Sequence, residues 1–146
     1  MSNLTNYAEN KIVDALLRGQ SLGAPATWHV ALLTAASDAE AGTVTEVSGG
    51  SYARVSVTAS LANFSSTQSA GSTTASSGTG GLSSNNGAIT FPAPTANWGT
   101  VTHWALYDAS SSGNAWVIAA LTASKTINNG DAAPSFAAAA LSLTVA

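Results

Sequence analysis

The chain has 146 residues, enough for about one domain with one core, and it lacks cysteine, which excludes disulfides and thiolate-bound metal. Only 8% of the residues are charged and the net charge is -3, whereas an average domain has about 25% charged residues. The four basic residues are scattered, and scattered cations neither displace the counterions of nucleic-acid phosphates nor hold a protein on anionic lipid, so neither partner is expected.

The first segment is predicted to be an amphipathic helix over residues 3–18. Apolar residues recur along it every four positions, at Leu4, Ala8, Ile12 and Leu16. Ser2 or Asn3 is expected to cap its start, and Gly19 to close its end in the left-handed conformation. Its apolar face either covers an open end or face of a sheet or docks on a partner. The start has neither the pattern of a signal peptide nor an apolar run long enough for a membrane span.

After Pro25 the apolar period changes to two, which is typical of strands. Strands are predicted in six segments: 27–35, 52–59, 88–94, 99–109, 115–124 and 139–146. In the first of them, Trp28, Val30 and Leu32 share one face, and His29, Ala31 and Leu33 share the other. Short strands separated by Gly, Asn and Ser predict a mainly β fold, an antiparallel β-sandwich or jelly roll with one N-terminal helix.

The stretch "EVSGGSYAR", residues 46–54, joins an acid, a turn and a base. Gly49 and Gly50 can adopt the positive backbone angles of a tight turn. Glu46 and Arg54 flank this turn and are expected to meet across it as a structural ion pair. The stretch is therefore predicted to change the direction of the chain rather than to carry chemistry.

Residues 65–88 form a low-complexity segment of Ser, Thr, Gly and Ala, with no charge and with Leu82 as the one large apolar side chain. Such a composition buries too little area to offset the entropy of ordering. We expect a single domain over residues 1–146, with this segment as an extended loop within it. It is either a mobile loop or an assembly arm that becomes ordered against neighbouring subunits.

Residues 97–109 are predicted to lie at the centre of the sandwich. Strict alternation places Thr102, Trp104 and Leu106 on one face. The other face then receives Val101, His103, Ala105 and Tyr107. The core aromatic residues are expected to be Trp28, Trp104, Tyr107 and Trp116.

No motif for catalysis is recognised in the sequence. The nucleophile elbow, the phosphate loop, the HExxH motif and the EF-hand loop are all missing. His29 and His103 each lie in a predicted strand beside a tryptophan, where a packed or hydrogen-bonded imidazole is the usual outcome. The "NNGD" stretch at 128–131 could direct oxygens at a cation, but Asn129-Gly130 is first a turn former. We expect no enzymatic activity, no cofactor and no metal site.

Three stretches carry a family resemblance: "ALLTAASDAEAGTVTEVSGGSYARVSV" at 31–57, "ITFPAPTANWGTVTHWALYDASSSGN" at 89–114 and "KTINNGD" at 125–131. They resemble a family of small tailed-phage virion proteins that automated naming often labels tail-fibre-like. The order and spacing of "EVSGGSYAR" and "FPAPTANWGTVTHWALYDA" are the most specific part of this resemblance. The resemblance covers most of the chain after the helix, but not residues 65–88 or the alanine-rich end.

The resemblance implies a non-enzymatic structural subunit of a phage particle. Small β-rich phage proteins of this size are similar to capsid decoration (cement) proteins, which bind the outer shell and bridge neighbouring capsomers. The expected partners are then the major capsid protein of the same phage and further copies of the chain, as a dimer or trimer. The expected location is the outer capsid surface of the virion, after synthesis in the host bacterial cytoplasm.

Two alternatives remain open. A tail fibre or tail-tip component fits the family naming, although the chain has neither the long repeat nor the heptad run that fibres commonly show. A carbohydrate-binding module is the second alternative, because tryptophan rings can stack on sugars. The four candidates are Trp28, Trp98, Trp104 and Trp116, although tryptophans in a sandwich more often form the core and its rim.

Overall fold

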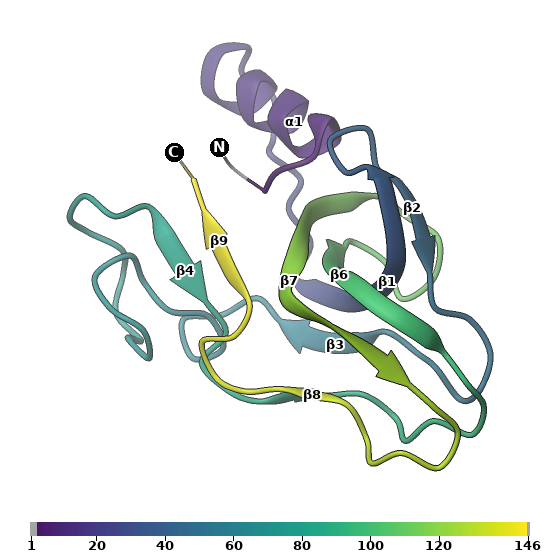
Figure 1. The fold of residues 1–146 in the computed structure, drawn as a ribbon. Coiled ribbons are helices and arrows are strands. Elements are labelled where there is room, and N and C mark those ends of the chain that lie inside the picture. The colour runs from purple at the N-terminus through teal and green to yellow at the C-terminus, as the bar shows by residue number, and fades with distance from the viewer. Residues whose placement is uncertain (1–2, 146) are drawn as a thin grey trace.

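The computed structural model describes residues 3–145, which form one helix and nine strands (Figure 1). In chain order they are α1 Asn6–Leu17, β1 Thr27–Asp38, β2 Thr43–Glu46, β3 Val55–Thr58, β4 Leu82–Ser84, β5 Ile89–Thr90, β6 Gly99–Tyr107, β7 Ala115–Ile127, β8 Ser135–Phe136 and β9 Ser142–Thr144. Every pairing between these strands is antiparallel. The prediction of a mainly β, antiparallel fold with one N-terminal helix is confirmed.

Strand β1 organises the main sheet, whose order is β2-β1-β6-β7. One edge of β1 pairs with β6. The other edge pairs with two strands, with β3 along residues 27–30 and with β2 along residues 33–38. The chain therefore leaves this edge after β2, loops through residues 47–54 and rejoins the same edge in β3.

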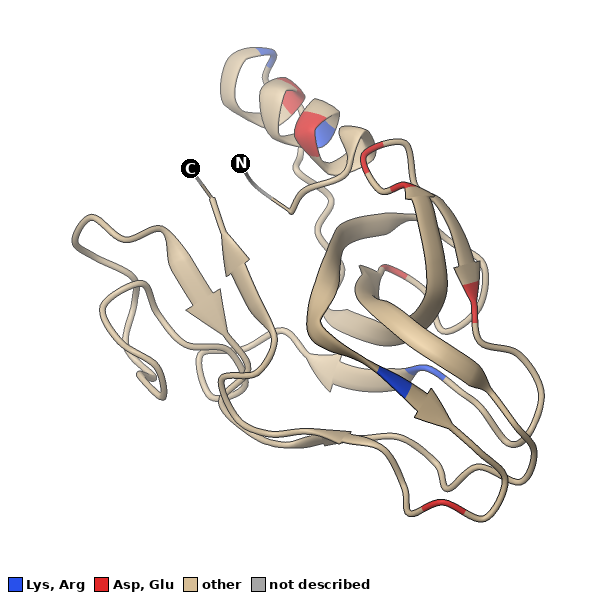
Figure 2. Ribbon diagram, viewed as in Figure 1, with Lys and Arg blue, Asp and Glu red and all other residues tan. Residues whose placement is uncertain are grey.

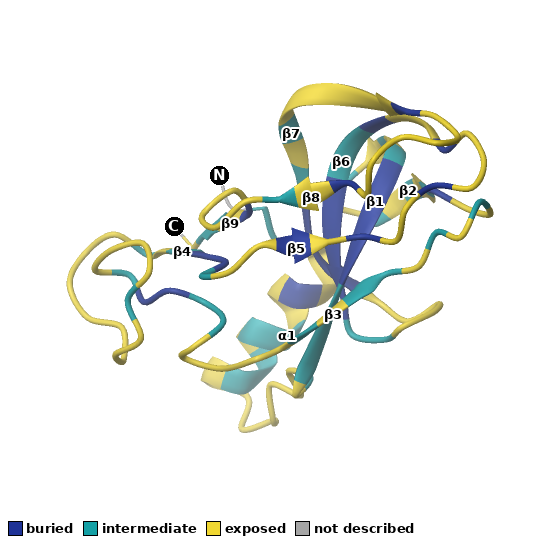
Figure 3. Cartoon of the chain, turned by 90° about the horizontal axis from the view of Figure 1, so that it is seen from below, coloured by how far each residue is buried: buried dark blue, intermediate teal, exposed yellow. Residues whose placement is uncertain are grey.

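The second layer consists of two short strand pairs, β4 with β9 and β5 with β8, instead of a full second sheet. The main core lies between this layer and one face of the main sheet. Figure 3 shows the buried parts of the main-sheet strands in the centre of the molecule, with exposed loops around them. The sheet contributes residues such as Val30, Leu32 and Trp104, and the second layer contributes Ile89 and Phe91. A smaller cluster on the other face contains Ala31, Leu33, Ala105, Tyr107, Ala115 and Ile118. The predicted division of strand 27–35 into two faces is confirmed.

One predicted face assignment is wrong, because Val101 lies in the main core together with Trp104. The pairing of β6 with β7 runs from Val101 with Lys125 directly to His103 with Ala120. Along this interval β7 advances five residues while β6 advances two, so the extra residues form a bulge opposite Thr102. A bulge bends and twists the ladder locally, and on its far side Val101 of β6 faces the main core.

The helix starts at Asn6 instead of residue 3, and Thr5 caps it instead of Ser2 or Asn3. Ser2 lies outside the described residues. The Thr5 hydroxyl accepts the N–H of Ala8 at 3.3 Å and donates to the carbonyl of Ala115 at 2.7 Å. Residues 3–5 are extended because they pair with the edge of β7, where Thr5 N–H donates to the Trp116 carbonyl at 3.0 Å.

The other end of the helix agrees with the prediction, because Gly19 follows it with a φ of 69°. Ala8 is fully buried against the sheet. The helix therefore covers the end of the sheet with its first half. In residues 3–145, no helix is long and apolar enough to cross a membrane.

The segment 65–88 folds back on the domain and contributes β4. Its ends are buried at Ser65, Ser84 and Asn85, whereas residues 73–80 are exposed. The Asn85 side chain donates to the carbonyls of Gly87 at 2.8 Å and Ala137 at 2.9 Å, and it accepts the N–H of Leu141 at 2.9 Å. Hydrogen bonds of Asn85 therefore hold the end of this segment on the domain, although the composition of the segment predicts little burial.

Candidate functional site

Arg54 and Glu46 form a bidentate ion pair across the turn. Arg54 Nε lies 2.9 Å from Glu46 Oε1, and Nη2 lies 2.8 Å from Oε2. Nη1 donates to the carbonyls of Ala109 and Ser112, each at 2.8 Å. The Arg54 side chain is only 6% exposed. It therefore fastens the turn to the loop between β6 and β7, and its hydrogen-bond donors are largely occupied.

Two tyrosines complete this network, and their part in it was not predicted from the sequence. The Tyr52 hydroxyl donates to Glu46 Oε1 at 2.7 Å and accepts the N–H of Leu32 at 3.0 Å. The Arg54 guanidinium lies 3.6 Å from the centre of the Tyr107 ring, an arrangement that favours the cation. The position of Tyr52 two residues before the arginine was the one available signal for its role.

The pKa shifts in this network are those of buried groups that contact one another. Burial raises the pKa of Tyr52 far above its ordinary value, and the hydrogen bond to Glu46 raises it further. Burial also raises the pKa of Tyr107, with a smaller effect from the charge of Glu46. Burial alone would lower the pKa of Arg54, but the hydrogen bond to Glu46 and its charge raise it overall. Both tyrosines are therefore neutral and Arg54 is charged at physiological pH.

The turn itself requires glycine at position 50. Gly49 and Gly50 have φ angles of 74° and 57°, which side chains rarely adopt. The carbonyl of Gly50 accepts the indole N–H of Trp98 at 2.9 Å. A Cβ atom on Gly50 would lie 2.8 Å from that indole nitrogen and 3.0 Å from the Cβ of Ala96. The turn therefore packs directly on the core.

The aromatic residues named from the sequence occupy the core or its rim. Trp104, Tyr107 and Trp116 are buried, and Trp28 is half-buried. Trp28 and Trp116 meet edge to face, with ring centres 5.5 Å apart. Trp98 is buried as well. Three of the four tryptophans considered for sugar stacking therefore have no free ring face.

Asn129 and Gly130 form the turn between β7 and β8, where Gly130 has a φ of 84°. Asn129 N–H donates to the Asn97 side chain at 2.9 Å. The Asp131 carboxylate accepts the N–H of Asn128 at 2.8 Å. This carboxylate thus closes the turn.

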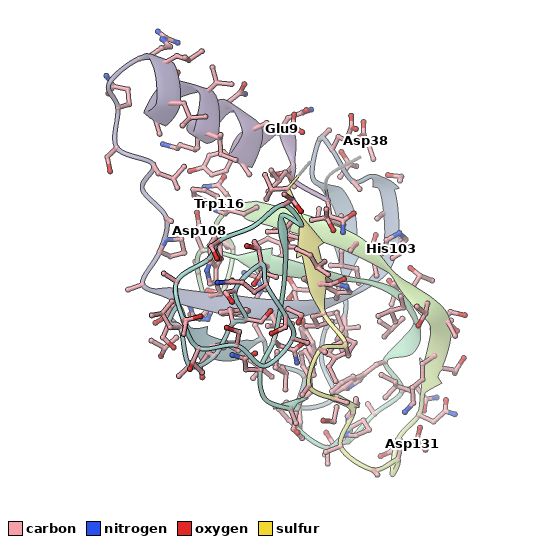
Figure 4. The ribbon with its side chains drawn as sticks, turned by 90° about the vertical axis from the view of Figure 1, so that its left-hand side faces the viewer. Glu9, Asp38, His103, Asp108, Trp116 and Asp131 are labelled. Atoms are coloured by element: carbon pink, nitrogen blue, oxygen red, sulfur yellow. The ribbon has the colours of Figure 1, made fainter. Side chains whose placement is uncertain are left out.

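The two histidines make local contacts. His29 Nδ1 lies 3.1 Å from the Ser56 hydroxyl, and His103 Nδ1 lies 2.8 Å from that of Thr102. Within residues 3–145 no three His, Asp or Glu side chains gather as metal ligands would. In Figure 4 Glu9, Asp38, Asp108 and Asp131 are labelled at separate places on the molecule.

Asp108 organises the loop between β6 and β7. Its carboxylate accepts the N–H of Asn114 at 2.8 Å and the indole N–H of Trp116 at 3.2 Å. Partial burial alone would raise the pKa of Asp108, but these hydrogen bonds together lower it. The carboxylate is therefore a structural acceptor in its charged form.

An apolar groove of about 430 Å³ opens between α1, the loop before β1, residues 59–65 and the β4–β9 pair. We call this the apolar groove and define it by six of the residues that line it: Leu4, Ile12, Leu22, Trp28, Leu61 and Val145. Its polar lining consists of serine side chains, and none of its lining residues is charged. Figure 2 shows the same absence of charge along β4 and β9. The groove is large enough to receive several apolar side chains.

Exposed apolar side chains surround the groove. Leu61 and Val145, on its wall, are 58% and 55% exposed. Beyond Ile12 the helix exposes Val13, Leu16 at 77% and Leu17 at 82%. Large exposed apolar patches are typical of association sites. The groove and the distal half of α1 are therefore the candidate functional site, and sequence periodicity identified only the helix.

The comparisons with known proteins give a family. A family model described as "Podophage GP4 fiber I protein gp80" matches residues 3–144, nearly the whole chain. No curated protein matches the chain. The resemblance to phage virion structural proteins with tail-fibre-like naming is thereby confirmed. The chain belongs to the podophage GP4 fiber I protein gp80 family and is a structural protein of the phage virion.

Proposed function

We propose that the chain is a structural subunit of a phage tail fibre and that it associates with a neighbouring chain through the apolar groove. The description of its family, which names a fibre protein, supports the fibre over the capsid decoration role expected from size and fold. The observation that carries the association is the groove, which is uncharged and is bordered by exposed Leu and Val side chains.

The chemistry of such an association follows from the composition. No Asp, Glu, Lys or Arg occurs between Arg54 and Asp108, so this part of the chain cannot recognise a partner through ion pairs of these side chains. Affinity has to come from burial of apolar area, at about 25 cal/mol per Å². Repeated copies in one particle would add avidity to each contact. The network of Glu46, Tyr52, Arg54 and Tyr107 stabilises the turn within each copy. This structural role agrees with the expectation of no enzymatic activity.

Immunogold electron microscopy of intact particles tests the location. An epitope inserted in the exposed part of the 65–88 segment, at residues 73–80, lies away from the core and should leave the fold intact. Gold on the tail fibres is the expected result. Gold distributed over the faces of the capsid would overturn the proposal and favour a decoration protein bound to the major capsid protein. An epitope in a host protein absent from the particle is the negative control.

A further inference from the structure

We propose that the occupant of the apolar groove is the distal end of α1 from a second copy of this chain, in a two-fold dimer that exchanges the two helix ends. This inference rests on the proposed role of the groove as an association surface. It does not depend on where the protein sits in the particle.

The distal half of the apolar stripe of α1 is exposed. Ala8 is fully buried and Ile12, one turn later, lines the apolar groove. Leu16 lies one further turn along the same stripe, yet it is 77% exposed. Figure 1 shows this end of α1 projecting away from the sheets. The helix thus carries an apolar projection that no described residue of its own chain covers.

The apolar projection and the apolar groove lie side by side. Ile12 belongs both to the helix stripe and to the wall of the groove, and Leu22, just after the helix, lines the groove as well. A two-fold interface uses the same patch on both subunits, so that patch must complement itself. A patch made of a projection next to a hollow meets this requirement, because each copy inserts its projection into the hollow of the other.

The exposed apolar area of this patch suits a small specific interface. A fully exposed Leu or Val side chain corresponds to on the order of 100 Å² of apolar surface. Six large apolar side chains of this patch are between 38% and 82% exposed: Val13, Leu16, Leu17, Leu22, Leu61 and Val145. Each copy thus presents several hundred Å² of apolar surface. Together with the polar rim that surrounds such a patch, two copies reach the range of about 1,200 Å² at which specific interfaces begin.

The charges around the groove favour an uncharged partner surface. The groove has no charged lining residue, and the charged side chains near the helix end, Asp14 and Arg18, already pair with each other at 3.0 Å. Neither surface therefore requires a counter-charge from a partner. A basic or acidic partner would leave its charges unpaired here, whereas the apolar helix end of a second copy would not.

Sedimentation equilibrium of the purified chain tests the dimer. The wild-type chain is expected to be a dimer. The double variant Leu16→Asp, Leu17→Asp should raise the dissociation constant by at least about a hundredfold, because two leucines lose their burial. Leu82→Asp is the matched control, because Leu82 is 47% exposed on β4 but does not line the groove. It should remain a dimer, and circular dichroism should show that all variants are folded.

A cross-linking experiment tests the exchange of helix ends. Because the chain has no cysteine, a thiol-specific reagent reacts only at the cysteine that is introduced. An equimolar mixture of Leu17→Cys and Leu61→Cys chains, treated with a short bismaleimide, should give a cross-linked pair of one chain of each kind. A mixture of Leu17→Cys with Ser110→Cys should not. Three results would overturn the inference: a wild-type chain that is monomeric at every concentration, a trimer, or a dimer that survives Leu16→Asp, Leu17→Asp. None of these results bears on the location of the chain in the particle.

Discussion

The Tyr52 hydroxyl accepts the backbone N–H of Leu32 at 3.0 Å. Leu32 lies in the gap on one edge of β1 where neither β2 nor β3 pairs with it. Strand β2 ends at Glu46 and β3 begins at Val55, so the ladder is interrupted beside Leu32. A side chain therefore supplies the acceptor that a backbone carbonyl supplies in a continuous sheet. The same hydroxyl donates to Glu46, which links the interrupted edge to the ion pair with Arg54.

The first prediction is that Tyr52→Phe destabilises the fold by about 1 to 3 kcal/mol, because it leaves a buried N–H without an acceptor. Chemical denaturation at neutral pH measures the change. Tyr7→Phe, at an exposed tyrosine of α1, is the control and should change the free energy of unfolding by less than about 0.5 kcal/mol. Equal stability of the Tyr52→Phe and wild-type chains would show that the hydrogen bond to Leu32 is dispensable.

The second prediction concerns alkaline pH. Burial and Glu46 raise the folded-state pKa of Tyr52 above the ordinary value of 10.0, so the folded chain holds this proton more tightly than the unfolded chain. The associated stability is fully present below about pH 10 and is lost as the pH rises further. The free energy of unfolding should therefore fall above pH 10. The fall should be shallower in Tyr52→Phe, and parallel pH profiles would contradict the assignment.

The third prediction concerns acid. The hydrogen bonds from Asn114 and Trp116 lower the folded-state pKa of Asp108 below its ordinary value of 3.8. The associated stability is present above the ordinary pKa and is lost as the pH falls through the lowered folded value. Because the carboxylate is partly exposed, solvent screening keeps this effect small. Urea midpoints measured at decreasing pH should decline less in Asp108→Asn than in the wild type, and an identical acid dependence would refute the role.

The fourth prediction is that Trp104→Ala costs about 3 to 5 kcal/mol, because the ring is only 4% exposed in the main core. Thermal and chemical denaturation measure it. Leu16→Ala removes an apolar side chain that is 77% exposed, and at concentrations where the chain is monomeric it should be almost neutral. An unchanged melting temperature of Trp104→Ala would place this ring at the surface and renew the case for sugar stacking.

The fifth prediction separates the ends of the 65–88 segment from its middle. Asn85→Ala removes three hydrogen bonds, of which two hold the end of β4 to Ala137 and Leu141 and one is local, to Gly87. It should cost at least about 2 kcal/mol. Replacement of residues 73–80 by a short Gly-Ser linker should cost less than about 1 kcal/mol, because this stretch is exposed. The two variants are compared by melting temperature, and a larger loss from the linker would mean that the middle stabilises the fold.

The periodicity of the sequence predicted the elements whose structure depends on neighbouring residues in the chain. The four-residue period gave α1, and alternation gave the two faces of β1. The start of the helix was missed because Thr5 pairs with Trp116, more than a hundred residues away. Val101 was misplaced because it lies beyond a bulge in the β6–β7 pairing, which bends and twists the ladder locally and has no signal in the periodicity of β6.

The candidate site was predictable only in part. The amphipathic period of α1 identified one side of it, and the alternative of a docking helix was already open. The groove depends on how Leu61 and Val145 approach the helix. Leu61 lies in no periodic pattern, and the alternation that predicts a strand over 139–146 does not place Val145 beside the helix. The strands β4 and β8 have three and two residues, too few to show any period. Pairing with β9 and β5 holds them in place instead.

The most direct test of the account is the number of copies of this chain in purified particles, measured by quantitative mass spectrometry with the major capsid protein as internal standard. A fibre subunit is present in a small fixed number, far below the copy number of the capsid protein. We expect that low and constant ratio. A ratio approaching one copy per capsid protein would contradict it and would make the chain a component of the shell.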